Sequence, residues 1–145
     1  MLATLVRKEG RMLAGARLEA IVPVSNLDRA IEFYGRTLGL GTPERDEMPE
    51  NPGARFDLGA ATLYVYESVG AGQSRHTLAG FTVDNVEQTV EDLGRNGVTF
   101  EEYDLPHLKT EGGIAKVGDE RVAWFRDPDG NILAIGERVR VGATA

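Results

Sequence analysis

Hydrophobic and polar positions along this chain follow one pattern twice. From residue 18 to residue 24 apolar side chains alternate with others, which is typical of a strand, and from residue 27 they recur every three or four residues, which is typical of a helix. The same succession starts again near residue 78, and residues 24–34 match residues 83–93 in the order of apolar and polar positions. A pattern repeated at fixed spacing predicts one supersecondary unit used twice.

Each predicted helix begins at a residue that can cap it and ends at a glycine. Ser25 or Asn26 precedes the first helix, and Asp84 precedes the second, with Glu87 at the spacing of a capping box. The apolar stripes are Leu27, Ala30, Ile31, Tyr34 and Leu38 in the first helix and Val86, Val90 and Leu93 in the second. We expect these stripes to be buried against the strands that precede the helices, at Val22, Val24, Phe81 and Val83.

Strand-like runs follow each helix. They are residues 41–47, 54–58 and 62–67 in the first half, and residues 99–103, 114–117, 121–126 and 132–137 in the second. The segment Asp-Pro-Asp-Gly-Asn at 127–131 predicts a tight turn, because Pro fixes φ while Gly and Asn tolerate positive φ. Small residues at 70–74 mark the boundary between the halves. The prediction is therefore an N-terminal extension (1–17), one domain (18–138) with βαβββ modules at about 18–69 and 78–138, and a C-terminal tail (139–145).

The order of these motifs resembles the vicinal oxygen chelate superfamily, which includes glyoxalase I, bleomycin-resistance proteins, fosfomycin-resistance enzymes and extradiol dioxygenases. The resemblance rests on the helix opening V-x-N-L-x-x-A-x-x-F-Y at 24–34, on the Gly-Leu pair at 39–40 and on the turn at 127–131. It implies an α+β fold, the glyoxalase/bleomycin resistance/dihydroxybiphenyl dioxygenase fold. In that fold paired βαβββ modules form curved mixed sheets around a cavity with the helices outside, usually in a homodimer.

The resemblance also implies four positions at which family enzymes hold a divalent metal through His, Gln or Glu. These positions fall here on Glu19, Tyr64, Leu78 and Ala134. Leu and Ala have no donor atom, and a neutral Tyr is a poor ligand for Mg²⁺, Mn²⁺ or Zn²⁺. We therefore expect no resident metal and no other cofactor.

A shifted set of ligands is the alternative. A change of register brings in Glu67, His76 or Glu137, but one residue of shift turns a side chain to the other face of the sheet, and two residues move it by about 7 Å. Under this alternative the protein is a metal-dependent lyase, epimerase or dioxygenase whose metal is held by a shifted ligand set that includes Glu19 and a histidine. His76 and His107 both fall in loop-like stretches, which favours surface positions for them.

Aromatic residues are further candidates for a binding site. Tyr64 and Tyr66 share a strand face, opposite Leu63 and Val65, which we expect to pack on the helix. The sequence leaves open whether these tyrosines line a cavity or fill it. It also leaves open whether Trp124, the only tryptophan, or the phenylalanine that follows it faces that cavity.

Composition narrows the function classes. The 145 residues include no cysteine, which excludes disulfides and thiolate chemistry. The net charge of −7 argues against nucleic acid as a partner, and no apolar run approaches the roughly 20 residues of a membrane span. The sequence contains no nucleophile elbow, Walker A loop or dinucleotide fingerprint. The first 15 residues do not resemble a signal peptide, so we expect an extension or a true start at Met12, and a cytoplasmic protein.

The leading hypothesis is a homodimer that binds or sequesters a small amphipathic or aromatic molecule in an apolar cleft between the modules. The candidate ligand-binding residues are Glu19, Tyr64, Tyr66, Leu78, Trp124 and Ala134. The acidic net charge favours a cationic ligand. Residues 101–113 either cover the ligand or form a hairpin connection. A further possibility is an interaction domain whose pocket is filled by its own tyrosines and tryptophan.

Overall fold

The computed structural model describes residues 12–46 and 50–138. The helical elements are η1 (Met12–Gly15), α2 (Leu27–Ile31), η2 (Glu32–Thr37) and α3 (Val86–Arg95). The strands are β1 (Glu19–Val24), β2 (Glu44–Asp46), β3 (Gly53–Asp57), β4 (Thr62–Glu67), β5 (Thr77–Thr82), β6 (Asp104–Leu105), β7 (Leu108–Glu111), β8 (Ile114–Val117), β9 (Glu120–Arg126) and β10 (Ile132–Arg138). None of the helices in these described stretches is long and apolar enough to cross a membrane.

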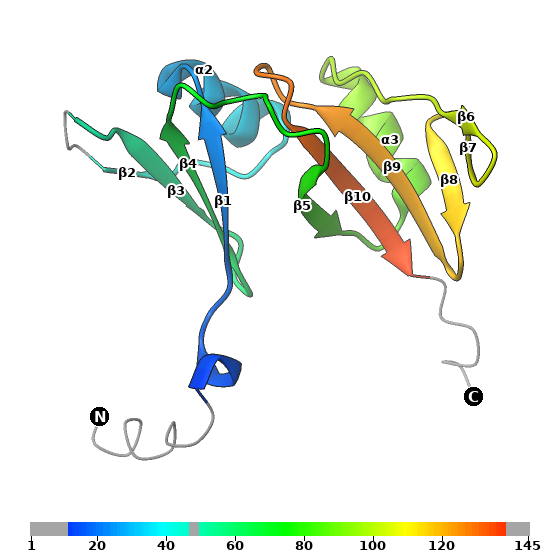
Figure 1. Ribbon diagram of the computed structural model, residues 1–145, viewed down its shortest axis with the longest axis horizontal. Helices are drawn as coiled ribbons and strands as arrows, with labels where there is room; N and C mark the ends of the chain where they lie inside the picture. Colours follow the sequence, from blue (N-terminus) through cyan, green and yellow to red (C-terminus); the bar gives the residue numbers. More distant parts are fainter. Residues whose placement is uncertain (1–11, 47–49, 139–145) are drawn as a thin grey trace.

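The strands form two mixed sheets that lie side by side (Figure 1). The first sheet has the order β1-β4-β3-β2 and the second the order β5-β10-β9-β8-β7-β6. In each sheet the strand before the helix runs parallel to the last strand of its module, β1 to β4 and β5 to β10, and the other pairs are antiparallel. The predicted α+β fold of paired βαβββ modules is confirmed. The two sheets do not close on one another.

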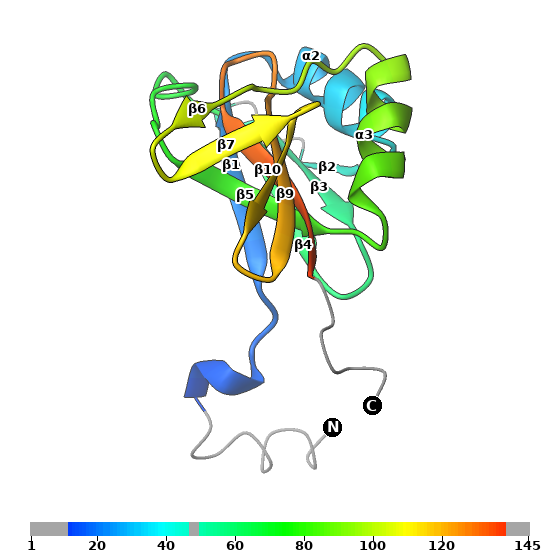
Figure 2. The same ribbon diagram turned by 90° about the vertical axis from the view of Figure 1, so that its right-hand side faces the viewer.

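Both long helical segments lie on one side of the sheets (Figure 2). Asn26 and Asn85 have extended backbones, and their side-chain oxygens accept hydrogen bonds from Arg29 N and Gln88 N at 2.9 Å. The prediction of Asp84 as the second cap was wrong by one residue. Asn85 has the extended backbone of a cap, and its side chain accepts from the third helical N–H group.

The first helix changes its winding along its length. After α2 the chain continues as the π-helical segment η2, and Leu38 N donates to Phe33 O at 2.8 Å. Gly39 then ends the helix, as predicted, with φ at +80°, a conformation that favours glycine. A π-helical segment is rare and is often found at a functional site.

The core lies between the helices and the sheets and is shared by both modules. Its largest fully buried side chains include Tyr34, Phe56, Phe125 and Leu133. The predicted stripe residues Leu27, Tyr34 and Val86 are buried. Ile31, Val90 and Leu93 are only half-buried and pack against the margin of this core.

Three predicted segments differ in the structure. Residues 99–103 form no strand and make only a bridge from Phe100 to Phe125, because β8 occupies the edge of β9 along residues 120–123. Residues 101–113 contain the hairpin β6-β7, which extends the sheet through β8, so the predicted hairpin connection is present. The run predicted at 41–47 is a strand only at 44–46, and residue 47 lies outside the described residues.

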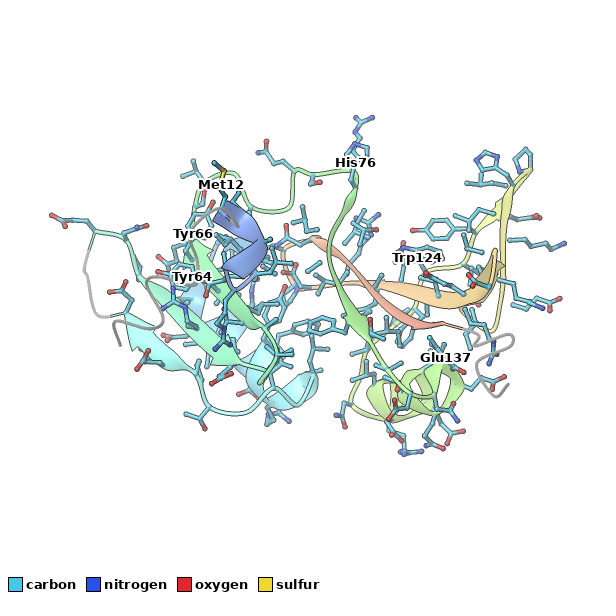
Figure 3. The ribbon with its side chains drawn as sticks, turned by 90° about the horizontal axis from the view of Figure 1, so that it is seen from below. Met12, Tyr64, Tyr66, His76, Trp124 and Glu137 are labelled. Carbon is cyan, nitrogen blue, oxygen red and sulfur yellow. The ribbon has the colours of Figure 1, made fainter. Side chains whose placement is uncertain are left out.

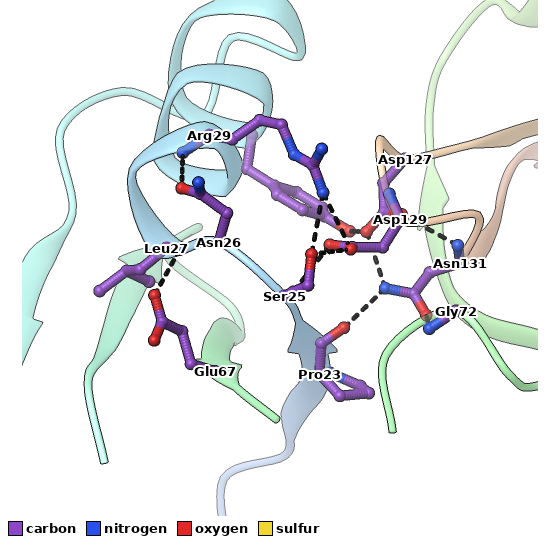
Figure 4. A network of polar contacts seen from close by, with 11 residues as sticks. Pro23, Ser25, Asn26, Leu27, Arg29, Glu67, Gly72, Asp127, Asp129 and Asn131 are labelled. Carbon is purple, nitrogen blue, oxygen red and sulfur yellow. Dashed lines mark hydrogen bonds and ion pairs between the residues drawn. The ribbon is translucent and has the colours of Figure 1, made fainter. Parts of the chain in front are cut away.

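The turn between β9 and β10 ties the second module to the first (Figure 4). The Asp129 carboxylate accepts hydrogen bonds from Ser25 N at 3.0 Å, from Ser25 Oγ and from Arg29 Nη2 at 2.9 Å. Tyr34 OH donates to Asp127 Oδ2 at 2.7 Å. Burial, then the neighbouring Asp127 charge, raises the pKa of the Tyr34 phenol, which therefore stays a donor.

Asn131 completes the same connection. Its Nδ2 donates to Pro23 O at 2.7 Å and to Asp127 Oδ2 at 2.8 Å, while its Oδ1 accepts from Gly72 N at 3.1 Å. Asn131 and Asp127 are both buried. The Asp-Pro-Asp-Gly-Asn motif thus connects a strand, a helix and the linker between the modules, in addition to forming the predicted turn.

Candidate functional site

The sheet faces opposite α2 and α3 form a surface that neither of these helices covers, here called the open face (Figures 2 and 3). In β4 Leu63 and Val65 are buried towards the helices, so Tyr64 and Tyr66 lie on the open face, as predicted. In β9 Phe125 is fully buried, which places Trp124 on the open face. The alternation of each strand therefore sends these three aromatic side chains to the same side of the molecule.

Glu19 lies on the open face within a small polar cluster. Its carboxylate accepts hydrogen bonds from Arg55 Nε at 2.5 Å and from Thr62 Oγ1 at 2.7 Å. The hydrogen bond from Arg55, followed by that from Thr62, lowers the pKa of Glu19. The Glu19 charge is therefore balanced within the protein.

Arg55 and Thr62 were missed by sequence reasoning, although a signal for Arg55 was present. Arg55 alternates with the buried residues Ala54 and Phe56, so the predicted strand already placed it on the face of the tyrosines. Thr62 is the direct neighbour of Glu19 across the β1–β4 pair. That pairing joins residues far apart in the sequence, and no local pattern reveals it.

An aromatic ridge stands beside this cluster. The Arg55 guanidinium carbon lies 4.6 Å from the centre of the Tyr64 ring, which is a cation–π geometry. The Tyr64 and Tyr66 rings are stacked, with centroids 6.3 Å apart and planes 11° apart. Burial, then the negative charge of Asp46, raises the pKa of Tyr64, so its phenol is neutral near pH 7.

The open face of the second sheet is an apolar floor with Trp124 beside it. Trp124 pairs across the strands with Ala134, and Ala134 with Gly80, so small residues lie next to the indole. In the next row Gly136 pairs with Val122. Tyr103 packs edge-on against Trp124 at 5.6 Å between ring centroids, which holds the indole in place.

The two parts of the open face are opposite in shape. Counted along corresponding strands, Tyr64 and Tyr66 of the first module occupy the positions of Ala134 and Gly136 in the second. Ile21, which is 58% exposed, likewise corresponds to Gly80. We call the large side chains of the first module the ridge and the small residues of the second module the hollow, and Figure 3 shows Tyr64 and Tyr66 on a different sheet from Trp124.

The residues at the family's metal positions do not fit a divalent metal. Leu78 and Ala134 offer no donor, the Tyr64 phenol is neutral, and the Glu19 carboxylate is already bound to a guanidinium and a hydroxyl. In the described part of the chain no group of three or more His, Cys, Asp and Glu side chains is placed to hold a metal ion.

The shifted ligand set is not assembled either. Glu67 Oε2 accepts a hydrogen bond from Leu27 N at 2.9 Å, and Glu137 Oε1 accepts one from Val86 N at 2.8 Å. Both carboxylates therefore bind the first turn of a helix, away from the open face, as Figure 3 shows for Glu137. His76 lies exposed in the segment before β5, and His107 lies exposed in the turn between β6 and β7.

The chain belongs to the glyoxalase/bleomycin resistance protein/dioxygenase superfamily, whose sequence profile matches residues 17–135. It is 30% identical over 125 residues to the uncharacterized protein YraH of Bacillus subtilis (strain 168), covering 77% of this chain and 90% of that protein. It is 27% identical over 150 residues to a probable chloroplastic lactoylglutathione lyase of Arabidopsis thaliana, covering 94% of this chain and 39% of that protein.

Solved structures show the same fold. A glyoxalase family protein from Enterococcus faecalis superposes with a TM-score of 0.65 at 20% identity, covering 87% of this chain and all (100%) of the other. TnmS3, an antibiotic binding protein from Streptomyces sp. CB03234, superposes with a TM-score of 0.60 at 19% identity, covering 86% of this chain and 96% of the other. At these identities the likeness is one of fold alone.

Proposed function

We propose that this protein binds a small amphipathic or aromatic molecule on its open face without a metal. One observation carries the proposal: the four positions that hold the metal in family enzymes are here a balanced carboxylate (Glu19), a neutral phenol (Tyr64) and two apolar side chains (Leu78 and Ala134). Apolar surface with a few polar groups is the usual composition of a small-molecule site.

The chemistry of the open face favours a planar ligand with one polar edge. Gly80 and Ala134 leave room for a flat ring beside Trp124, and apolar contact stabilises it there. The Arg55–Glu19 pair and the tyrosine hydroxyls provide hydrogen-bonding groups for a polar edge. The net charge of −7 accelerates the approach of a cation. TnmS3, described as an antibiotic binding protein, shares the fold, which is compatible with this class of function.

We further propose that a second copy of the chain completes the site. Tyr64 and Tyr66 lie on a different sheet from Trp124 but on the same side of the sheets (Figure 3), so the ridge does not fill the hollow next to Trp124 within one chain. A two-fold axis brings the ridge of one copy over the hollow of the other, and two-fold dimers are the commonest oligomers. A ligand held between ridge and hollow loses most of its contact with water.

The test uses proflavine, a planar aromatic cation, as the probe on chelator-treated protein. Because Trp124 is the only tryptophan, quenching of its fluorescence reports binding at the open face. Trp124→Ala and Ala134→Phe should each weaken proflavine binding at least tenfold, because the first removes the indole and the second fills the hollow. In Trp124→Ala, which has no tryptophan to quench, the polarisation of proflavine fluorescence measures binding. Ala60→Phe, the same substitution at an exposed position between β3 and β4, is the matched control and should bind as the wild type does.

Three results contradict the proposal. Equal affinity in Trp124→Ala, Ala134→Phe and wild type places the probe elsewhere. Binding that appears only after Tyr66→Ala shows that the protein's own aromatic side chains fill the site. Binding that requires an added divalent metal and is lost in Glu19→Ala favours the metal-dependent enzyme.

A further inference from the structure

A separate apolar cavity of about 240 Å³ lies on the helix side of the sheets, opposite the open face. Leu38 and Leu40 line it from the first module, and Phe81, Thr89, Leu93 and Phe125 are among the residues that line it from the second. None of the candidate residues of the open face contributes to it. The cavity is therefore distinct from the site of the proposed function.

The cavity lies where the two modules meet. Leu38 and Leu40 flank Gly39, whose φ of +80° turns the chain after the π-helical segment η2. This turn brings two leucines from the first module to β5 and α3 of the second. The π-helical segment leads directly into the cavity wall, and such segments are often found at binding sites.

The lining determines the chemistry of an occupant. Among the described residues no charged side chain lines the cavity; its polar residues are Thr82 and Thr89, and the Thr89 hydroxyl already donates to Asn85 O at 2.8 Å. A charged or strongly polar molecule would lose hydration there and find too few polar groups to replace it. An apolar molecule has no polar groups whose hydration would be lost, and it gains contacts with leucine and phenylalanine side chains.

We propose that this cavity is a second binding site, for an uncharged apolar molecule of about the size of one substituted aromatic ring. An engineered apolar protein cavity of roughly 150 Å³ stays free of water and binds benzene. The present cavity is larger, at about 240 Å³, and partly open, so a somewhat larger molecule can enter it. Because both modules form its walls, the occupant holds them together.

The first experiment measures the melting temperature (Tm) with increasing toluene. An occupant that binds only the folded protein stabilises it by mass action, so the Tm of the wild type should rise by a few degrees at saturation. Leu93→Phe fills the cavity and should abolish the rise. Leu78→Phe makes the same exchange on the open face and should keep the rise. The proposal is overturned if toluene leaves the wild-type Tm unchanged or raises the Tm of Leu93→Phe equally.

A second experiment does not depend on the stability of a variant. Crystals of the wild type under xenon pressure should show a xenon atom between Leu38, Phe81 and Leu93. Xenon found only at other positions overturns the proposal. Leu93→Phe should also leave proflavine binding at the open face unchanged. The proposal for the cavity and the proposal for the open face are therefore tested independently.

Discussion

At the scale of single residues, the side chains of this protein act through partners that are distant in the sequence. Glu19 was a candidate metal ligand from its position alone, yet the structure pairs it with Arg55, 36 residues away. Thr62 supplies a second hydrogen bond from the neighbouring strand. The carboxylate is therefore one half of an ion pair and is not an available metal ligand.

The Glu19–Arg55 pair predicts a specific dependence on pH. Because the pKa of Glu19 is lowered in the folded state, its contribution to stability is present above its ordinary value of 4.5 and is lost as the pH falls through the folded pKa. In Arg55→Met the pKa of Glu19 should return towards 4.5, and the loss of stability in acid should be smaller. Denaturant unfolding of both proteins between pH 7 and pH 3 measures this loss of stability. Arg45→Met, which removes an exposed arginine paired with Asp28, is the control.

Gly72 provides a second prediction at this scale. A Cβ atom on Gly72 would lie 2.0 Å from Asp129 O, and its φ is +75°. Gly72→Ala should therefore displace the turn that joins the modules and lower the free energy of unfolding by about 1–3 kcal/mol. Gly94→Ala, within α3 and with open space around it, should be neutral or stabilising by up to about 1 kcal/mol. Equal effects of the two substitutions in a denaturant titration would contradict this role for Gly72.

At the scale of elements, the two modules repeat their helix starts in detail. Asn26 and Asn85 cap the two helices, and Glu67 and Glu137, from the last strand of each module, bind the first helical N–H groups. The two glutamate hydrogen bonds connect each helix to its own sheet. They also retain both glutamates on the helix side, where they are unable to act as ligands on the open face.

This arrangement predicts which residue at the start of α3 matters. Asn85→Ala removes the side-chain oxygen that accepts from Gln88 N and should lower the free energy of unfolding by about 0.5–2 kcal/mol. Asp84→Ala, at the neighbouring position that the sequence favoured, should change it by less than about 0.5 kcal/mol. Thermal unfolding followed by circular dichroism distinguishes the two. A larger effect of Asp84→Ala would contradict this and would support the predicted capping box of Asp84 and Glu87.

At the scale of the whole molecule, the ridge and the hollow on the open face are the basis for the proposed dimer. Sedimentation at micromolar concentration should show a dimer, with an interface of more than roughly 1,000 Å² in total. Gly136→Trp, which places a bulky side chain in the hollow, should shift the protein towards monomer. Ala60→Trp, at an exposed position in the turn between β3 and β4, should leave it dimeric. A monomeric wild type would contradict the proposal.

Metal content is a second property of the whole molecule that can be tested. Protein purified without chelator should contain less than stoichiometric divalent metal, and EDTA should leave its Tm unchanged. The reason is the donor set, since a bound metal needs at least three good protein ligands and the family positions provide Glu19 alone. A drop of several degrees with EDTA, absent in Glu19→Ala, would favour the enzyme instead.

The sequence by itself determined the repeat, the fold class and the facing of most side chains. Period-two strands, helical stripes and glycine stops are local properties, so the opposite facing of Leu63 and Tyr64 follows from neighbouring residues alone. The Asp-Pro-Asp-Gly-Asn turn was also readable, because its residues have local conformational preferences. These predictions needed no knowledge of which strands become neighbours.

Only the tertiary structure decided the rest. The pairing of Glu19 with Arg55 depends on strand order and register, which bring residues of three strands together. The choice between Trp124 and Phe125 depended on which face the helices cover. The failure of residues 99–103 to form a strand followed from the position of β8, and the apolar cavity exists because two modules meet there. Such features arise from contacts between distant segments, and no pattern within a short stretch of sequence encodes them.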